Sequence, residues 1–407
     1  MTLHAQPALP SSTVATADVP DAAAQRRGLL ALAIGAFGIG LTEFVIMGLL
    51  LEVSQSIGVT AASAGLLVSG YALGVVFGGP LLTLLTSALP RRSVLLLLMT
   101  VFTLGNLACA LAPGYGLLMA ARVATGFAHG TFFGVGATVA QQLVPPERKG
   151  SAIALMFTGL TLANVLGVPF GTWIGQAWGW RATFMAICAI GVIAIAAIAM
   201  AVPRLPVEGG RKRFGKELAA MLRKGPLLGF AMTVLGYAGV FLLFTYIAPV
   251  LTQMSGFSKT SVSPLLLLFG FGLVAGNLAG GRLADRDLRL AVFGTLLALA
   301  GTLIVSRWGF ASMIGARLLI ALFGAVAFST VAPLQAWTIR QAQGADEGLA
   351  STFNISAFNL GNAIGAWIGG AVLTAGWGLP SLFLVAAIPP AMAAGIAFFV
   401  VKPENLP

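Results

Sequence analysis

The sequence predicts an all-α membrane protein, with twelve transmembrane helices arranged as two parallel six-helix repeats. Three observations support this fold class: a low charge content, twelve apolar segments of spanning length and an internal repeat. The chain of 407 residues is 58% hydrophobic and 9% charged, and its mean hydropathy is +0.96. Soluble domains carry about 25% charged residues. The charged residues here are therefore too few to cover a water-soluble globule.

Twelve apolar segments have the length that a membrane-spanning helix needs, which is about 20 residues. Open sheets are excluded in lipid, because their backbone groups would lack hydrogen-bond partners. A barrel is not expected either, since no segment shows the alternating pattern of barrel strands. The predicted spans cover residues 28–51, 62–85, 93–112, 116–142, 151–175, 182–202, 227–251, 262–283, 291–306, 311–339, 350–374 and 381–401.

The positive residues between these segments predict the orientation of the chain. With the N-terminus inside, the tails and the even-numbered loops hold 18 of the 23 Lys and Arg residues. Cytoplasmic loops of membrane proteins carry such an excess. We therefore expect a multi-pass protein of the plasma (inner) membrane with both termini in the cytoplasm. This topology accounts for the net charge of +11, and no nucleic-acid partner is expected, because no basic soluble domain is predicted.

The loops divide the predicted spans into two halves of six. We expect a disordered cytoplasmic tail (1–27), an N-terminal six-helix half (28–202), a basic cytoplasmic linker (203–226), a C-terminal six-helix half (227–401) and a short cytoplasmic tail (402–407). A shift of 198 residues aligns the halves, so that Asn164 meets Asn362. Because six is even, both halves have the same orientation, as in one large class of transporters.

Small residues recur every four positions on the second, fifth, eighth and eleventh segments. Such stripes let helix backbones approach closely. They could serve static packing, or they could form a smooth interface on which two rigid halves slide or rock. Their presence on symmetry-related helices favours the second interpretation. The predicted interface residues are Gly74, Gly78, Gly167, Pro169, Gly171, Gly272, Gly276, Gly365 and Gly369.

Several motifs resemble those of the major facilitator superfamily. Residues 280–286 (GGRLADR) with Arg289 resemble its loop signature, 122–130 (RVATGFAHG) its helix-4 arginine motif, and 159–175 the Gly/Pro signature of its exporting branches. The segments TEFVIMGLL (42–50) and VPPERKGSA (144–152) resemble the arabinose-efflux-permease-like group of the twelve-helix drug:proton antiporters. The resemblance covers residues from about 28 to 401 and implies transport by alternating access.

The resemblance also implies a cytoplasmic latch between the halves at the loop signature. A carboxylate there can stabilise a helix N-terminus and pair with arginines. In the first half Thr83 and Ser87 stand where Gly and Asp are expected, so only Asp285 supplies that charge. The latch is therefore predicted to be stronger in the second half. Its predicted residues are Arg91, Arg92, Asp285, Arg286 and Arg289.

Glu43 is the one acidic residue well inside a predicted span. An intramembrane carboxyl group is costly and indicates a functional site. Arg122 lies at similar depth, since at 1.5 Å per residue the two residues are about 12 Å and about 9 Å from the outer ends of their segments. We expect Glu43 to pair with Arg122 and to carry protons as its exposure to water changes. The alternative is a structural Glu–Arg bridge.

His129 follows Arg122 by two helical turns and shares its face. It is the only histidine in a predicted span, and imidazole changes charge near neutral pH. His129 is therefore a candidate for passing protons inward from Glu43. The alternative is a histidine that only packs, because Gly126, Gly130 and Gly134 indicate close helix contacts nearby.

Helix faces also predict a substrate cavity with aromatic and apolar walls, which is typical of pockets for apolar small molecules. Arg317 is the symmetry mate of Arg122. Its side chain either extends toward the membrane surface, or faces Glu43 or an anionic substrate group. Asn164, Asn359 and Asn362 are the candidates for a sugar site. The predicted cavity residues are Met47, Phe133, Tyr237, Phe241, Arg317 and Gln335.

Taken together, these features predict a proton-coupled secondary transporter that exports small, rather apolar, drug-like molecules. The alternatives are a sugar or nucleoside efflux permease and, in another class, a polytopic membrane enzyme. No phosphate-binding motif is present, and Cys109 and Cys188 lie in apolar runs without metal-ligand spacing. We therefore expect no catalytic residue, nucleotide, cofactor or metal. The expected partners are a small-molecule substrate, protons and the bilayer, and the expected state is a monomer.

Overall fold

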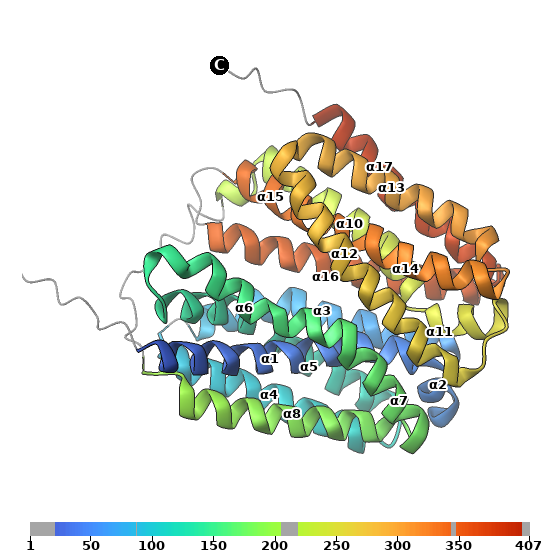
Figure 1. Cartoon of the computed structure of the whole chain (residues 1–407). Coiled ribbons are helices and arrows are strands. Elements are labelled where there is room, and N and C mark those ends of the chain that lie inside the picture. Colours follow the sequence, from blue (N-terminus) through green and yellow to red (C-terminus); the bar gives the residue numbers. More distant parts are fainter. Residues whose placement is uncertain (1–20, 87, 205–218, 343–346, 401–407) are drawn as a thin grey trace, which may run out of the picture.

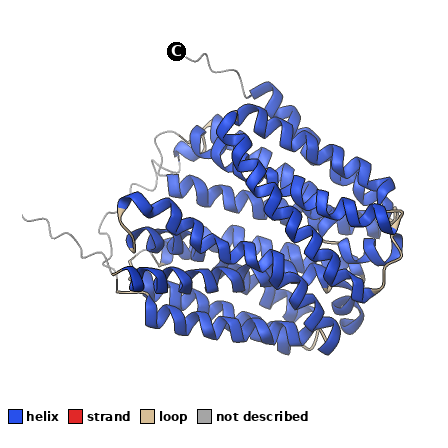
Figure 2. Cartoon of the chain, viewed as in Figure 1, coloured by secondary structure: helices blue, strands red, loops and turns tan. Residues whose placement is uncertain are grey.

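The computed structural model describes residues 21–86, 88–204, 219–342 and 347–400. These ranges are helical and contain no strand (Figure 2). The linker and both tails lie largely outside them. Two helices begin outside the predicted six-helix halves: α1 starts inside the segment predicted as a tail, where Asp21 caps it by accepting from the Ala24 backbone N–H at 2.6 Å, and α10 starts at Lys224, inside the predicted linker.

The N-terminal half crosses the bundle six times. Its elements are α1 (Ala22–Gly48) continued by α2 (Leu50–Ile57), α3 (Ala61–Leu85), α4 (Arg91–Leu111), α5 (Tyr115–Gln142), the broken unit η1 (Pro146–Arg148), α6 (Lys149–Leu162), η2 (Ala163–Gly167) and α7 (Val168–Trp178), and α8 (Trp180–Ala201). The predicted span 151–175 is thus divided by a π-helical turn. Pro169 lacks the N–H that a regular helix needs at this point, and such turns accommodate that loss.

The C-terminal half also crosses six times. Its elements are α10 (Lys224–Phe244) continued by α11 (Ile247–Pro249) and η3 (Val250–Met254), then η4 (Lys259–Ser261) with α12 (Val262–Arg286), α13 (Leu288–Gly309), α14 (Met313–Ser329) continued by α15 (Val331–Gln341), α16 (Glu347–Thr374) and α17 (Leu379–Val400). Caps separate the elements: Asp287 accepts from the Leu290 N–H to start α13, and Ser312 accepts from the Gly315 N–H to start α14. The twelve-helix, two-repeat prediction is confirmed.

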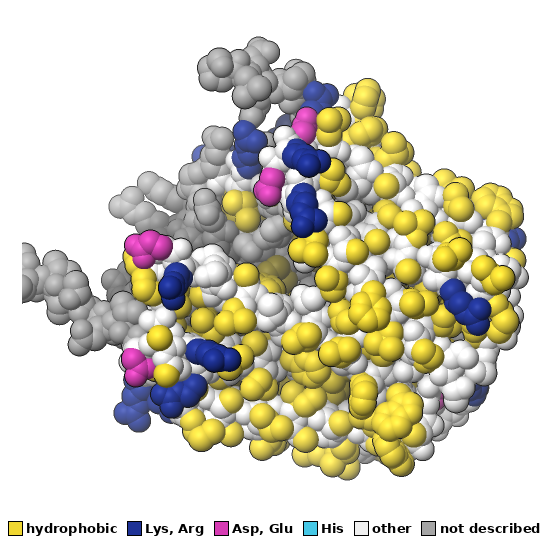
Figure 3. Space-filling model, in the orientation of Figure 1, with side chains coloured by type: hydrophobic (Ala, Val, Ile, Leu, Met, Phe, Trp, Pro, Cys, Tyr) yellow, Lys and Arg dark blue, Asp and Glu magenta, His cyan; other side chains and the backbone are white. Residues whose placement is uncertain are grey.

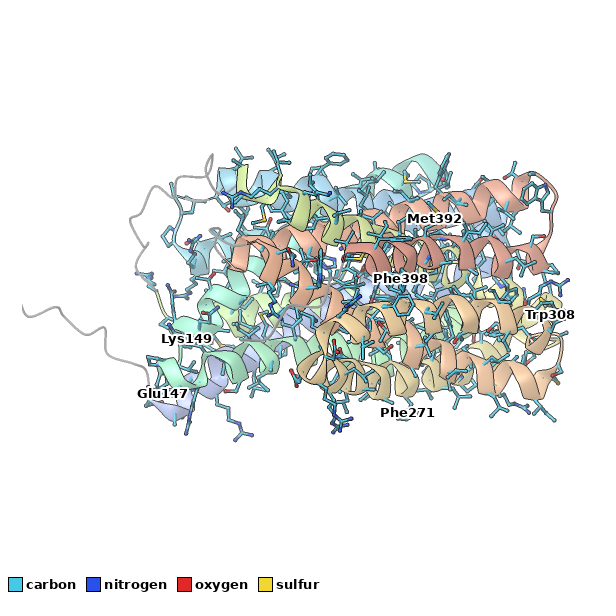
Figure 4. The ribbon with its side chains drawn as sticks, turned by 90° about the horizontal axis from the view of Figure 1, so that it is seen from above. Glu147, Lys149, Phe271, Trp308, Met392 and Phe398 are labelled. Carbon is cyan, nitrogen blue, oxygen red and sulfur yellow. The ribbon has the colours of Figure 1, made fainter. Side chains whose placement is uncertain are left out.

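The surface is that of a membrane protein. Ten of the described helical segments are long and apolar enough to cross a bilayer. The helices α5 and α16, of 28 residues each, are also long enough to do so. Hydrophobic side chains cover the middle of the visible face, whereas most charged side chains gather at one end (Figure 3). Glu147 and Lys149 lie at that end and Trp308 at the opposite end, with the exposed Phe271 between them (Figure 4).

We call the end at which α1 begins and α17 ends the terminal end, and the opposite end the far end (Figure 1). The ribbons of the two halves draw together toward the far end and diverge toward the terminal end. Hydrogen bonds between the halves follow the same pattern. Ser69 Oγ of α3 donates to the Ala363 carbonyl of α16 at 2.8 Å, and Ser263 Oγ of α12 donates to the Pro169 carbonyl of α7 at 2.7 Å.

Further polar contacts close the far end. Gln176 Nε2 of α7 donates to the Lys259 carbonyl of η4 at 2.8 Å, and Lys259 Nζ donates to Gln55 Oε1 of α2 at 3.0 Å. Each contact joins a residue of one half to a residue of the other. The far end is therefore held by several hydrogen bonds.

The prediction that the glycine stripes form the interface between the halves is wrong. The stripes pack helices within each half, because a Cβ added at these positions would clash with, or lie in tight contact with, a helix of the same half. Gly74 and Gly78 of α3 face α5, Gly167 and Gly171 of α7 and its π-helical turn face α1, Gly272 and Gly276 of α12 face α14, and Gly365 and Gly369 of α16 face α10. The spacing predicted close approach correctly but could not identify the partner helix.

Other residues bring the halves together. A Cβ at Gly270 of α12 would lie 2.8 Å from the Val165 Cα in the π-helical turn, which belongs to the opposite half. Gly65 of α3 similarly faces the Tyr246 ring of the C-terminal half. Of the predicted interface set, Pro169 is in place, since its carbonyl accepts from Ser263.

Candidate functional site

Glu43 lies in the middle of α1, and contacts from both halves of the molecule converge on it. Its side chain is 9% exposed. Glu43 Oε2 lies 3.9 Å from His129 Nδ1 of α5, and Glu43 Oε1 accepts a hydrogen bond of 3.4 Å from Asn362 Nδ2 of α16. Both distances are longer than those of strong charge-assisted contacts. The carboxyl group is thus buried but loosely held.

His129 connects Glu43 to a residue that sequence reasoning missed. The Tyr71 hydroxyl of α3 lies 3.1 Å from His129 Nδ1, so this one nitrogen faces both the hydroxyl and the carboxyl group. The His129 ring also contacts Phe133, with centroids 5.2 Å apart. Tyr71 is one of only four tyrosines in the chain. The position of Tyr71 inside a predicted span could have marked it as a candidate site residue. The direction in which its side chain points depends on the rotation of α3 about its axis, which the sequence does not give.

Arg122 is fully buried, but in this structure it does not form the predicted pair with Glu43. Its Nη1 donates to the Thr42 carbonyl of α1 at 2.7 Å, and its guanidinium carbon lies 4.3 Å from the centroid of the Tyr71 ring. The side chain of Thr42 is held in turn, because its hydroxyl donates to Asn106 Oδ1 at 2.6 Å. Within the described residues, His129 is the basic side chain that lies within 4.0 Å of the Glu43 carboxyl group, at 3.9 Å.

The depth estimate for Arg122 was sound, and Arg122 is close enough to interact with Glu43 electrostatically. The helical rise alone does not reveal that Arg122 Nη1 donates to a backbone carbonyl of α1, that of Thr42. Arg122 Nη2 is buried and has no hydrogen-bond partner in the described structure. A buried donor without a partner is costly, so this atom is available to a partner that arrives in another state of the protein.

Aromatic rings of the C-terminal half surround the other side of Glu43. Phe44, the next residue of α1, lies 5.8 Å from Phe241 of α10 between ring centroids. Tyr237 packs edge-on against Phe358 of α16 at 4.4 Å. On the N-terminal side Phe133 stacks on Phe157 at 5.0 Å. Phe133, Tyr237 and Phe241 therefore lie in the aromatic walls on the two sides of the Glu43 cluster.

Three of the predicted cavity residues lie elsewhere. Met47 is fully buried in α1, one turn after Glu43 in the direction of the far end. Arg317 is exposed on α14, with its guanidinium carbon 5.3 Å from the centroid of the Phe257 ring. Of the two alternatives for Arg317, the structure therefore has the outward extension. Helix periodicity predicts the face of the helix on which each residue lies, but it does not predict which helix packs against that face.

Gln335 belongs to a separate polar network in the C-terminal half. Its Nε2 donates to Ser351 Oγ at 2.7 Å, and its Oε1 accepts from Asn354 Nδ2 at 2.6 Å. Asn354 Oδ1 accepts from the Thr233 hydroxyl at 2.9 Å. These groups satisfy one another, so the network fixes α15 against α16 and α10.

The predicted latch residues lie at the terminal end, and none of them forms an ion pair within the described ranges. Asp285 and Arg286 are exposed, and Arg92 donates to the Ala199 carbonyl of α8. Ser87, the counterpart of Asp285, lies outside the described residues. The helices of the two halves diverge at this end (Figure 1), so the latch stays a prediction for a state in which they meet.

An apolar groove of about 480 Å³ lies between α3, α5 and α16, outside this cluster. Leu73 and Trp367 on its walls are exposed, so it opens on the surface of the bundle. None of the predicted cavity residues lines it. The described residues contain no group of three or more His, Cys, Asp or Glu side chains that could hold a metal ion, and Cys109 and Cys188 are free thiols.

Comparison with known proteins decides the family. The model of the Major Facilitator Superfamily matches residues 32–343 and 229–407. The chain belongs to this superfamily. It is 44% identical to the inner membrane transport protein YdhP of Escherichia coli (strain K12) over 373 residues, which cover 92% of this chain and 94% of YdhP. These matches are to transporters and not to enzymes, so a polytopic membrane enzyme is ruled out.

Two other similarities are informative. The chain is 34% identical to a chloramphenicol resistance protein of Streptomyces lividans, over 85% of this chain and 88% of that protein. The crystal structure of a D-xylose-proton symporter superposes with a TM-score of 0.78 at 17% identity and covers 93% of this chain and 98% of that one. At this identity the second similarity shows the fold alone. The protein is therefore a multi-pass membrane transporter of the superfamily.

Proposed function

We propose that this transporter exports small, rather apolar molecules in exchange for protons, and that Glu43 carries the proton. One observation supports this most: a single buried carboxyl group at the meeting point of the two halves, contacted by His129 of its own half and Asn362 of the other. Coupling by alternating access requires a titratable group that changes its surroundings when the halves move. Glu43 is in such a position.

The proposed orientation places the terminal end in the cytoplasm, as the distribution of Lys and Arg favours. The structure then corresponds to a state closed toward the outside and directed toward the cytoplasm, because its inter-half hydrogen bonds lie at the middle and the far end. A buried carboxylate without a short charged partner is costly. We therefore propose that Glu43 carries a proton in this state, before releasing it inward.

His129 and Tyr71 provide a route for that proton. When the proton leaves Glu43, His129 Nδ1 can accept it across the 3.9 Å approach once the Tyr71 hydroxyl, 3.1 Å from the same nitrogen, turns its own proton away and accepts instead. Histidine is suited to a relay, because its ring has two nitrogens, of which one can accept a proton while the other donates one. Arg122, whose Nη2 has no hydrogen-bond partner within the described residues, stabilises the carboxylate that remains.

The aromatic walls support an apolar substrate. Rings from both halves, including Phe133 and Phe241, provide large apolar area with few polar groups, which is the usual composition of sites for apolar small molecules. The name of the similar chloramphenicol resistance protein points in the same direction. We expect the transporter to work as a monomer with no cofactor, driven by the proton gradient.

The test uses purified protein in proteoliposomes with an imposed pH gradient, and a panel of chloramphenicol, other drugs, sugars and nucleosides. The wild-type protein is expected to move apolar drugs against their gradient, and a protonophore should abolish this movement. Glu43→Gln should lose gradient-driven transport but keep exchange of substrate, because Gln keeps the shape and cannot ionise. Glu147→Gln, at an exposed acidic residue of the terminal end, is the matched control.

Full gradient-driven transport by Glu43→Gln would exclude Glu43 as the coupling residue. Transport of sugars or nucleosides without any drug transport would replace the proposed substrate class by the alternative one. Export that a protonophore leaves unchanged would overturn proton coupling itself.

A further inference from the structure

Asn362 differs from the other asparagines that were candidates for a polar site. Asn164, its mate in the internal repeat, donates to the Leu160 carbonyl of its own unit at 3.0 Å, and Asn359 donates to the Ile355 carbonyl of its own helix at 3.1 Å. Asn362 instead donates across the molecule to Glu43. It is 3% exposed, so this contact is made without solvent.

The Asn362–Glu43 contact joins the two halves at the proposed proton site. The other groups that face Glu43 are His129 and Arg122 from α5, and Tyr237 from α10, which interacts with Glu43 electrostatically. The Tyr71 hydroxyl of α3 reaches the site through His129. Within the described residues, Asn362 is therefore the residue of the C-terminal half that forms a hydrogen bond with Glu43.

The strength of this hydrogen bond depends on the charge of Glu43. A hydrogen bond to an ionised carboxylate is shorter and about twice as strong as one between neutral groups. At 3.4 Å the present bond is weak. Loss of the proton from Glu43 would therefore tighten the contact and hold the halves together in the present conformation.

We propose that Asn362 prevents the empty, deprotonated transporter from changing conformation. This inference rests on the proposed role of Glu43. After the proton has left toward the cytoplasm, the carboxylate binds the Asn362 amide and the far end stays closed. An acceptor group of the substrate that binds the Asn362 Nδ2 amide group takes the place of the carboxylate and so releases this contact. Asn362 Oδ1, which is buried and has no hydrogen-bond partner within the described residues, can accept from a donor on the same substrate. Only the substrate-bound form then opens outward, where Glu43 binds a new proton.

The proposed role of Asn362 explains why protons would not cross the membrane unless substrate moves in the opposite direction. An antiporter leaks protons when its empty form can change conformation both with and without a proton. Asn362 blocks one of these two steps in the empty protein. Removing it should therefore create proton flow that needs no substrate. Because a hydrogen bond to a charged group changes an equilibrium by about tenfold or more, the substrate-free proton leak should rise by about the same factor.

The experiment measures proton entry into proteoliposomes that contain a pH-sensitive dye and no substrate, after a pH gradient is imposed. Asn362→Ala is expected to leak about tenfold faster than the wild-type protein. Asn359→Ala is the matched control, since it removes a buried amide of the same helix that bonds within that helix. The double variant Glu43→Gln with Asn362→Ala should not leak, because the glutamine side chain that replaces the carboxyl group cannot carry a proton.

The possible outcomes separate the proposal from simple damage. A leak in Asn362→Ala that disappears in the double variant supports it. No increase, an equal increase in Asn359→Ala, or a leak that persists in the double variant would overturn it. If Asn362→Ala does not reconstitute, Asn362→Ser is judged by the same criteria. Failure of the proposed function is seen separately, as full gradient-driven transport by Glu43→Gln alone.

Discussion

Two serine hydroxyls hold the far end closed, and their removal should shift the balance between conformations. Ser69 Oγ donates to the Ala363 carbonyl at 2.8 Å, and Ser263 Oγ donates to the Pro169 carbonyl at 2.7 Å. Both serines are buried and each bond crosses between the halves. The variant Ser69→Ala with Ser263→Ala removes both bonds and leaves the hydrophobic contacts almost unchanged.

The size of the effect follows from the number of bonds. One buried hydrogen bond of this kind contributes about 1 kcal/mol net, and well-separated sites add. The closed far end should lose about 2 kcal/mol, which is about a 30-fold change in the ratio of open to closed far ends. A form with the far end open has already broken both bonds, so the free energy of that form hardly changes.

Distance measurements between spin labels can test this prediction. Labels on cysteines introduced at Leu111 and Ala311, which are exposed at far-end turns of the two halves, report opening directly. The native thiols Cys109 and Cys188 are buried and should label slowly. We expect the double serine variant to populate a longer label distance that is rare in the wild-type protein.

The matched control is Ser255→Ala. Ser255 Oγ donates to the Phe310 carbonyl at 2.7 Å, and both residues belong to the C-terminal half. It removes an equally short buried bond without affecting contact between the halves. The reasoning is refuted if the double serine variant keeps the wild-type distance distribution, or if Ser255→Ala opens the far end to the same extent.

Three further predictions concern stability and the latch. Gly276→Val should lower the melting temperature of the purified protein by forcing α12 away from α14, at a cost of about 1–3 kcal/mol, whereas Gly281→Val, where a Cβ meets nothing within 4 Å, should change it little. Asp285→Asn should reduce transport rates more than Ser87→Ala, and equal rates would contradict the asymmetric latch. Burial raises the pKa of Glu52 above its ordinary value of 4.5, so ionisation of Glu52 disfavours the folded state and stability falls as pH rises through the raised pKa. Glu52→Gln should make the melting temperature less dependent on pH above 4.5, and an unchanged slope would argue against this.

Local properties of the chain were enough to predict the fold and the most important residue of the site. Hydropathy, loop charge and the 198-residue repeat each depend on which residues occur along the chain, so the spans, the two halves and the intramembrane Glu43 could be read directly. The depth of Arg122 followed from the helical rise for the same reason. The family motifs added the major facilitator superfamily, which the comparisons confirm.

The tertiary structure decided which helix each side chain meets. The rotation of a helix about its axis and its choice of neighbour depend on packing along its whole length. For this reason the glycine stripes were assigned to the wrong interface, and Arg122 was paired with Glu43 although it binds the Thr42 carbonyl. The approach of His129 to Tyr71 and of Asn362 to Glu43 joins residues 58 and 319 positions apart. Such contacts arise only when four helices from two halves meet at one depth, and no local pattern in the chain records that meeting.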